Sequence, residues 1–305
     1  MTIASVSPTA IPSGPTPAPA SRREARMRQI RQGVLRAARN PSTLAGGIVV
    51  GLLVLAAVLA PLIATHDPMA QDLAARLKGP SAAHWFGTDQ LGRDIYSRLV
   101  YGARPTLLIV ALVIALAAPF GVAVGLIAGY FGGWAETVLM RVTDIVMAFP
   151  RLILALALVA VLKPGLINAV IAIAITAWPP YARLARAETL ALRHSEFVEA
   201  ARGLGMPSRK IITGQILPLC LSSVTIRATL DMAGIILTAA GLGFLGLGAQ
   251  PPMAEWGAMI AAGRDHIFDA WWVAAVPGLA ILAVSLGFNL LGDGLRDVLD
   301  PKHHD

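Results

Sequence analysis

Residues 195–218 read SEFVEAARGLGMPSRKIITGQILP and form the one long polar interruption between the apolar stretches of this chain. Ser195 is a favourable N-cap residue and predicts a helix that starts directly after it. The apolar residues of this helix recur at helical spacing on one face, namely Phe197, Ala200, Ala201 and Leu204. Gly205 is expected to end the helix, because glycine is the usual residue just past a helix C-terminus.

A second short helix is predicted to follow. Ser208 is expected to cap it, and Pro218 to end it. Its apolar residues are Ile211, Ile212 and Ile216. Two short helices with small apolar faces and basic neighbours are typical of a segment that docks into a groove of a partner. The alternative is an amphipathic hairpin that lies on the lipid surface.

The composition of the chain indicates a membrane protein. It is 56% hydrophobic and 14% charged, whereas soluble domains carry about 25% charged residues. The net charge of +7 does not indicate a nucleic-acid partner, because the basic residues lie in short segments beside apolar runs, as on a cytoplasmic side. The single cysteine, Cys220, excludes an intramolecular disulfide, and no Cys or His spacing indicates a zinc site.

The chain divides into tails and apolar spans. Residues 1–43 are predicted to be a disordered, basic cytoplasmic tail, with seven arginines and one glutamate between positions 22 and 39. Residues 44–65 carry no charge and are long enough for a first span. Residues 66–104 are polar and are expected to be extracytoplasmic. The transmembrane core is 105–296, with the cytoplasmic loop 193–218, and 297–305 form a cytoplasmic C-terminal tail.

The core is expected to contain further spans, which gives an all-α polytopic bundle of about six spans with both termini in the cytoplasm. Their predicted bounds are 105–130, 145–162 with a kink at Pro150, 166–182 with a bend at Pro179 and Pro180, 219–247 and 271–291. Residues 250–270 are expected to be an external loop. The spacing of Gly121, Gly125 and Gly129 predicts a ridge of small residues against which another helix packs closely.

Ionisable and amide side chains inside these spans are candidate functional residues. Arg141 and Asp144 are expected to form a structural pair at i,i+3 near the cytoplasmic face. Arg227 and Asp231 stand at i,i+4 within an apolar span, where charged groups face a partner or a watery path. They are candidate residues of a translocation pathway, with a purely structural ion pair as the alternative. Asn289 is a third candidate, and it could instead hydrogen-bond between helices.

Several short patterns do not indicate chemistry. Gly241, Gly243 and Gly246 spell G-x-G-x-x-G, but no strand precedes them, so close packing or a span end is the better interpretation. No G-x-x-x-x-G-K-[ST] occurs, so ATP binding by a Walker loop is excluded. No catalytic constellation is present, and we predict neither catalytic residues nor a metal site. His303 and His304 are interpreted as solvated tail residues.

Three stretches carry a resemblance to a known family. GTDQLGRD at 87–94, the Glu199-Ala200-Ala201 to Ile216-Leu217-Pro218 loop, and GDGLRDVLDPK at 292–302 resemble signatures of bacterial ABC importer permeases of the dipeptide/oligopeptide group, in the C-type of their two permease subunits. The resemblance covers roughly residues 40–302 and implies the type I importer permease fold. In this family the loop is the coupling segment that contacts a cytoplasmic ATPase. The residues that match it are Glu199, Ala200, Ala201, Gly205, Ile216, Leu217 and Pro218.

The resemblance also implies partners and a substrate class. The partners would be a second homologous permease, two cytoplasmic ATPases that bind ATP and Mg, an extracytoplasmic substrate-binding protein and the bilayer of the plasma membrane. No cofactor is expected in this chain, and the subunit itself is not expected to be an enzyme. Di- or oligopeptides are the expected substrates, with nickel or glutathione as alternatives within the same machinery. An ion-gradient-driven secondary transporter is the other alternative, but it would predict internal repeats and buried carboxylates, of which only Asp231 is a candidate.

Overall fold

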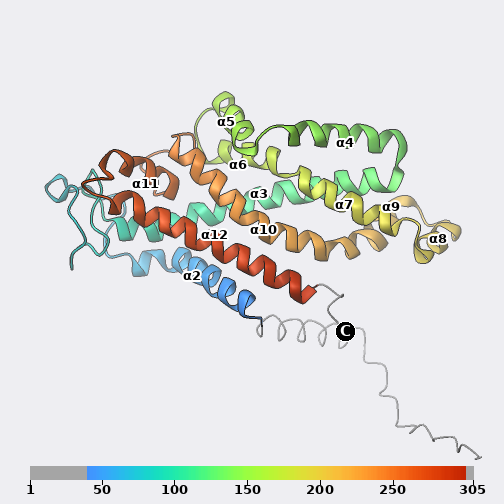
Figure 1. The fold of residues 1–305 in the computed structure, drawn as a ribbon, viewed down its shortest axis with the longest axis horizontal. Coiled ribbons are helices and arrows are strands. Elements are labelled where there is room, and N and C mark those ends of the chain that lie inside the picture. Colours follow the sequence, from blue (N-terminus) through green and yellow to red (C-terminus); the bar gives the residue numbers. More distant parts are fainter. Residues whose placement is uncertain (1–39, 300–305) are drawn as a thin grey trace, which may run out of the picture.

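The chain is helical in the part that the computed structural model describes, residues 40–299. These residues form no strand, and one isolated bridge pairs Thr88 with Asp94. The long helices run side by side along one direction (Figure 1). The elements are α2 Pro41–Ile63, η1 Leu73–Ala75, α3 Ile95–Phe131, α4 Gly133–Ala148, α5 Arg151–Leu162, α6 Leu166–Ala177, α7 Pro179–Leu192, α8 Glu196–Gly203, α9 Ser208–Ile211, the π-helical turn η2 Ile212–Ile216, α10 Leu217–Phe244, α11 Trp256–Gly263, η3 Arg264–His266 and α12 Trp272–Leu299. The predicted all-α class is confirmed.

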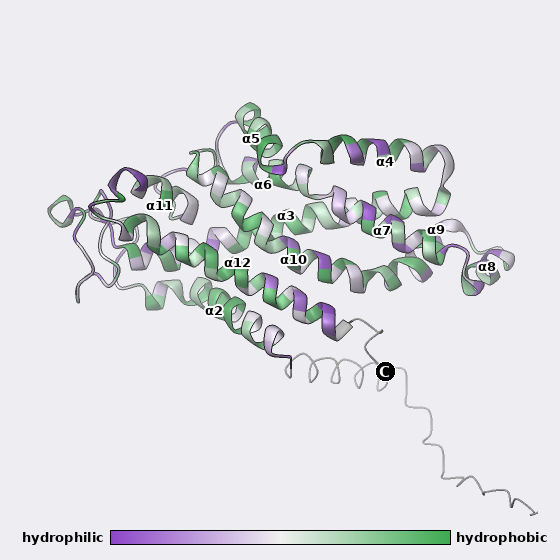
Figure 2. Ribbon diagram, viewed as in Figure 1, coloured by the Kyte–Doolittle hydropathy of each residue, from purple (hydrophilic) through white to green (hydrophobic). Residues whose placement is uncertain are grey.

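Four stretches within residues 40–299 are long and apolar enough to cross a membrane, namely Pro41–Ile63, Ile95–Phe131, Ser208–Phe244 and Trp272–Asp297. A fifth is present if α4 and α5 are counted as one broken span. Figure 2 shows hydrophobic ribbon along α2 and α3, and hydrophilic residues on α8 and at the C-terminal end of α12. The predicted span 166–182 is divided between α6 and α7. The 12 residues of α6 reach about 18 Å at ~1.5 Å per residue, which is less than the ~30 Å hydrocarbon core of a bilayer.

The second span starts earlier than predicted, at Ile95 instead of Pro105. Asp94 caps it, because its carboxylate accepts a hydrogen bond of 2.8 Å from the Ser97 amide. Pro105 lies inside the helix, at the cost of one backbone hydrogen bond. The preceding turns remain helical because they are packed, and the Trp256 indole donates a hydrogen bond of 2.9 Å to the carbonyl oxygen of Leu99. Residues 95–104 therefore belong to α3.

The predicted glycine ridge is confirmed, and α7 is the helix that packs on it. A Cβ atom at Gly121 would lie 2.4 Å from the Trp178 carbonyl oxygen, and one at Gly125 would lie 2.3 Å from that of Ala182. At Gly129 the nearest atom, 2.7 Å away, is a side-chain carbon of α7. Backbone therefore contacts backbone along successive turns of α3 and α7, as small-residue ridges allow.

The predicted third span is sharply broken. α4 and α5 meet at an angle of 91°, with Pro150 in an extended conformation between them. The i,i+3 spacing predicted that Arg141 pairs with Asp144, but this pair does not form. Arg183 of α7 donates a hydrogen bond of 2.7 Å to Asp144 instead, because α4 lies alongside α7, and its Glu136 accepts hydrogen bonds from Arg186.

The segment between α2 and α3 is held together by buried polar side chains of the 87–94 motif. The Asp89 carboxylate accepts a hydrogen bond of 2.7 Å from the Arg93 side chain and lies 3.7 Å from Arg98. Thr88 donates to the carbonyl oxygen of Ala75, and its own carbonyl oxygen accepts a hydrogen bond from the Trp272 indole. These contacts satisfy polar groups that would otherwise be costly to bury, so the motif fixes this segment to α3 and α12.

Both glycines of the motif occupy left-handed backbone conformations, with φ of +76° at Gly87 and +72° at Gly92. Only glycine adopts this region without strain. A Cβ atom at Gly92 would also lie 1.7 Å from the carbonyl oxygen of Asp72. Both glycines therefore make turns in which a residue with a Cβ atom would be strained.

Residues 250–270, predicted to be a loop, contain the helix α11. Glu255 caps α11 by accepting hydrogen bonds of 2.8 Å each from the amides of Gly257 and Ala258. Gly243 of α10 lets this cap approach closely, since a Cβ atom there would lie 2.1 Å from a Glu255 carboxylate oxygen. The packing interpretation of the G-x-G-x-x-G pattern is confirmed at this position. The loop prediction was wrong because α11 has only eight residues and its stability comes from tertiary packing.

The first and last spans lie side by side (Figure 1). α2 begins at Pro41 after the cap residue Asn40, slightly before the predicted start at 44. α12 continues to Leu299, so most of the 292–302 signature is helical and the predicted tail at 297–305 begins inside a helix. The predictions for residues 1–39 and for His303 and His304 lie outside the described residues.

Candidate functional site

The first candidate site is the helical loop at one end of the bundle, opposite the end that carries α11 and the 64–94 segment (Figure 1). α8 begins at Glu196 as the Ser195 position predicted. The Ser195 hydroxyl does not cap it, but donates a hydrogen bond of 2.6 Å to the Leu192 carbonyl oxygen. Glu199 lies in the first turn of α8, where the helix dipole favours a carboxylate.

Gly205 makes the turn between α8 and α9, as predicted. Its φ is +75°, and the amide of Met206 donates back to the carbonyl oxygen of Ala201 at 3.0 Å, which is the backbone pattern of a glycine helix end. The second cap prediction was off by one residue, since Pro207 is the N-cap and Ser208 is the first residue of α9.

The loop presents an apolar outer face and a buried inner face. Leu204 is 87% exposed and Phe197 is 43% exposed, and Ala200 is exposed between them in sequence. Val198 is fully buried and Ala201 nearly so. The predicted stripe is therefore split: Phe197, Ala200 and Leu204 are free to meet a partner, whereas Ala201 packs inward.

The loop is fixed to the bundle by two arginines. Arg193 donates a hydrogen bond of 3.2 Å to the carbonyl oxygen of Gly129 at the end of α3. The Arg202 guanidinium lies over the Tyr130 ring, 5.5 Å from its centroid. α8 is thus positioned against α3, and its outer face keeps a defined direction.

Pro218 does not end the second helix. The chain stays helical from Ser208 through the π-helical turn η2 into α10, and Pro218 falls in the first turn of α10, where the missing amide is tolerated best. Ile216 is buried, Leu217 is half-buried and Pro218 is exposed. The second half of the loop, from Ser208 onward, and the fifth predicted span are consequently one continuous helix.

The second candidate site is an ion network inside the bundle. Asp231 of α10 accepts a hydrogen bond of 2.8 Å from Arg151 of α5 and one of 3.4 Å from the Tyr181 hydroxyl of α7. The alternative interpretation, an ion pair between Arg227 and Asp231, is not seen, because the partner of Asp231 is Arg151 at the break between α4 and α5. The Nε atom of Arg227 and the Nε and Nη2 atoms of Arg151 are buried without a hydrogen-bond partner in the described part of the chain.

Asn289, the third predicted pathway residue, lies on α12 and is exposed. Its side chain makes no hydrogen bond to any of residues 40–299, so the alternative of a bond between helices within this chain is not seen. The structure does not bring Asn289 into the Asp231 network. Arg151 and Tyr181 were missed by the sequence analysis, although a lone arginine inside the apolar run 145–162 was a signal for the former.

Comparison with known proteins places the chain in a family. The sequence profile described as "Binding-protein-dependent transport system inner membrane component" matches residues 121–304. That match covers more than half of the chain. The chain belongs to this family of importer permeases. A second profile, "N-terminal TM domain of oligopeptide transport permease C", matches residues 29–80, in agreement with the resemblance of the three sequence signatures.

Similar permeases are known from several bacteria. The chain is 47% identical over 263 residues to the "Probable D,D-dipeptide transport system permease protein DdpC" of Escherichia coli K12, covering 86% of this chain and 88% of that protein. It is also 47% identical over 264 residues to the "Dipeptide transport system permease protein DppC" of Alkalihalophilus pseudofirmus, covering 87% of each. The subunit is therefore a polytopic inner membrane component of an importer, and not itself an enzyme.

The fold of the permease is also found among solved structures. An inward-facing structure of the MetNI methionine ABC transporter matches with a TM-score of 0.54 at 21% identity, over 67% of this chain and 97% of that chain. At this identity the match concerns the fold, which is that of a type I importer permease. A permease of this class works together with ATPase and other subunits.

Proposed function

We propose that this permease forms half of the pathway by which an ABC importer carries di- or oligopeptides across the plasma membrane. The observation that carries the substrate class is the 47% identity to dipeptide permeases over most of the chain. The proposed partners are a second homologous permease, two cytoplasmic ATPases that bind ATP and Mg, and an extracytoplasmic substrate-binding protein. This chain needs no cofactor of its own.

In this proposal α8 and α9 dock into a groove of the cytoplasmic ATPase. The exposed side chains of Phe197 and Leu204 supply apolar contact, and Ala200 lets the partner approach closely. Glu199 is 59% exposed and supplies a charge beside that contact. Gly205, Ile216, Leu217 and Pro218 shape and support the hairpin. Both chain termini then lie on the cytoplasmic side, with the 64–94 segment and α11 on the opposite side of the membrane.

The same proposal assigns a transport role to the Asp231 network. ATP binding closes the ATPases, and the movement reaches α10 through the continuous helix that starts at Ser208. Asp231 links α10 to α5 and α7 through Arg151 and Tyr181, so it supports the wall of the pathway. Arg227 and Asn289 remain candidate residues for contact with the passing peptide or with the second permease.

The test is uptake by the assembled complex in proteoliposomes, with a labelled dipeptide and a labelled pentapeptide as substrates. ATP-dependent accumulation of either peptide supports the proposal. Uptake of glutathione or nickel without peptide would replace the substrate class, and uptake driven by an ion gradient without ATP would refute the ABC mechanism.

A matched pair of variants tests the docking face. Leu204→Asp places a charge on a side chain that is 87% exposed, and Phe268→Asp does the same at a side chain that is 97% exposed in the segment between η3 and α12. A central apolar contact is worth about 2 kcal/mol, or roughly 30-fold in affinity. We expect Leu204→Asp to lose bound ATPase by about this factor and Phe268→Asp to retain it. Equal retention by both variants would place the ATPase contact elsewhere.

A further inference from the structure

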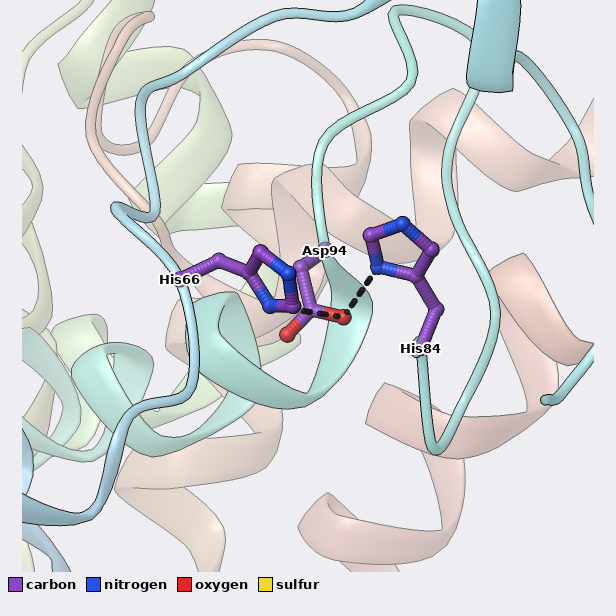
Figure 3. A group of neighbouring side chains, drawn as sticks. All are labelled: His66, His84 and Asp94. Atoms are coloured by element: carbon purple, nitrogen blue, oxygen red, sulfur yellow. Dashed lines mark hydrogen bonds and ion pairs between the residues drawn. The ribbon is translucent and has the colours of Figure 1, made fainter. Parts of the chain in front are cut away.

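Two histidines and an aspartate meet at the end of the bundle opposite α8. His66 follows the end of α2, His84 lies in the loop before the 87–94 motif, and Asp94 caps α3 (Figure 3). One ligand atom from each of the three lies within 4.8 Å of the other two. The cluster thus draws on three separate segments of the chain, and neither the proposed transport function nor the comparisons with known proteins account for it.

The carboxylate of Asp94 is oriented toward the two imidazoles. Its Oδ2 atom accepts a hydrogen bond of 2.8 Å from the Ser97 amide. Its Oδ1 atom lies 2.9 Å from Nδ1 of His84 and 3.9 Å from Nδ1 of His66. The imidazole rings face each other with centroids 4.7 Å apart and an angle of 32° between their planes. The Oδ1 atom is therefore hydrogen-bonded to His84 and lies near His66, whose Nδ1 atom is 3.0 Å from the Thr65 hydroxyl.

This arrangement has the dimensions and ligand types of a transition-metal site. Ligand atoms at about 2.0–2.1 Å from a tetrahedral Zn²⁺ are about 3.3 Å from one another. Two of the three observed separations, 2.9 and 3.9 Å, lie on either side of that value, and all three are within 4.8 Å, so side-chain rotations would close the site. A carboxylate held by a backbone amide is the kind of supported ligand that metal centres use.

Solvent access to the cluster also fits a cation. The side chain of His66 is 41% exposed and that of His84 is 18% exposed, so an ion can enter from solvent and keep a water molecule as its fourth ligand.

We propose that His66, His84 and Asp94 form a binding site for a divalent transition-metal ion, represented by Zn²⁺, with one position open to solvent. The bound ion would join the end of α2, the loop that contains His84 and the start of α3. The site goes beyond the proposed peptide transport, and its existence does not depend on which substrate crosses the membrane.

The experiment measures Zn²⁺ binding to the full-length permease, purified in detergent with its partner subunits and without a polyhistidine tag. All proteins carry His303→Ala and His304→Ala, so that the adjacent tail histidines contribute no background. Chelator-treated protein is titrated with Zn²⁺ by calorimetry. We expect the background protein to bind one Zn²⁺ ion per copy of this chain. In His66→Ala and in His84→Ala, the affinity for this ion should fall by more than the roughly 10–100-fold that loss of a supporting partner causes.

Further variants separate a metal ligand from a structural histidine. His66→Cys supplies a different metal-binding atom and is expected to recover most of the affinity, whereas His266→Ala, at the same end of the bundle, is expected to bind as the background protein does. X-ray absorption of the zinc-loaded protein is expected to show two imidazole ligands. Absence of saturable binding up to 100-fold molar excess, or equal binding by the background protein and both alanine variants, would overturn the site. Peptide uptake is scored separately, so failure of the metal site and failure of the proposed function are distinguishable.

Discussion

Two adjacent glycines in α2 allow a direct test of how the first and last spans pack. A Cβ atom at Gly46 would lie 2.4 Å from the Leu291 amide nitrogen and 2.6 Å from the Gly287 carbonyl oxygen of α12, whereas a Cβ atom at Gly47 would have no neighbour within 4 Å. Both atoms that the Gly46 methyl would meet belong to the backbone, so no side-chain rotation can relieve the overlap. Ordinary contact begins near 3.4 Å, and α2 and α12 would therefore have to separate by about 1 Å.

The magnitude follows from two opposing effects. Replacement of glycine by alanine inside a helix stabilises it by about 0.8–1.0 kcal/mol, and this gain applies equally to Gly46→Ala and Gly47→Ala. Overpacking costs about 1–3 kcal/mol and applies only to Gly46→Ala. The comparison of the two variants thus isolates the packing cost.

The assay is thermal unfolding of the purified complex in one detergent at a fixed scan rate. At about 2–4 °C per kcal/mol, we expect Gly46→Ala to unfold roughly 2–12 °C below Gly47→Ala. Gly47→Ala should match or slightly exceed the wild type. Equal unfolding temperatures for the two variants, or a more stable Gly46→Ala, would refute close contact between the backbones of α2 and α12.

Three further predictions concern the two candidate sites and α11. Gly205→Ala forces a residue with a Cβ atom into φ of +75° at a cost of about 1–2 kcal/mol, so coupled ATPase activity should fall. The control is Gly214→Ala, whose added methyl meets nothing within 4 Å and which should behave as wild type. Equal ATPase activities of the two variants would contradict the turn. Asp231→Asn leaves the Arg151 guanidinium without its charged partner and should destabilise the complex by about 1–3 kcal/mol, with partial recovery when Arg151→Leu is added, as thermal unfolding will show; no recovery would argue against the pair. Burial raises the pKa of Glu255 above its ordinary 4.5, although the hydrogen bonds from its two amide donors act to lower it. The contribution of Glu255 to stability is therefore greatest at low pH and decreases as the pH rises through the raised pKa. The unfolding temperature of Glu255→Gln relative to wild type should therefore increase from pH 4.5 to pH 8, and a difference that is constant with pH would contradict the raised pKa.

Local sequence patterns predicted the elements whose stability is local. The uncharged run at 44–65 became α2 within a few residues at each end, because a long apolar stretch has no other way to satisfy its backbone in a bilayer. Gly205 marked the turn of the loop because its backbone conformation is unfavourable for residues with a Cβ atom. The glycine ridge of α3 was predicted from its spacing, since small residues four positions apart allow another helix to approach closely.

These local patterns could not predict which side chains far apart in the sequence would pair. The i,i+4 rule paired Asp231 with Arg227, but its partner Arg151 lies 80 residues away. Which arginine reaches that carboxylate depends on the 91° break between α4 and α5, and a proline in the sequence indicates a kink without giving its direction. The cluster of His66, His84 and Asp94 could not be predicted either. Its residues stand at irregular spacing and meet only after the 87–94 motif has folded.

The continuous helix from Ser208 to Phe244 has a mechanical consequence. The 23 positions from Ser208 to Asp231 correspond to about 35 Å at ~1.5 Å per residue, so α9 and α10 together act as a lever arm with the loop at one end and the ion network well along its length. A tilt of about 10° about the Asp231 end would move the loop end by about 6 Å, a distance comparable to one helical turn. The π-helical turn at Ile212–Ile216 lies close to the loop, so any bending there would absorb torque before it reached the membrane. If the proposed function holds, the stiffness of this turn determines how much of the displacement caused by ATPase closure is transmitted along α10 to Asp231.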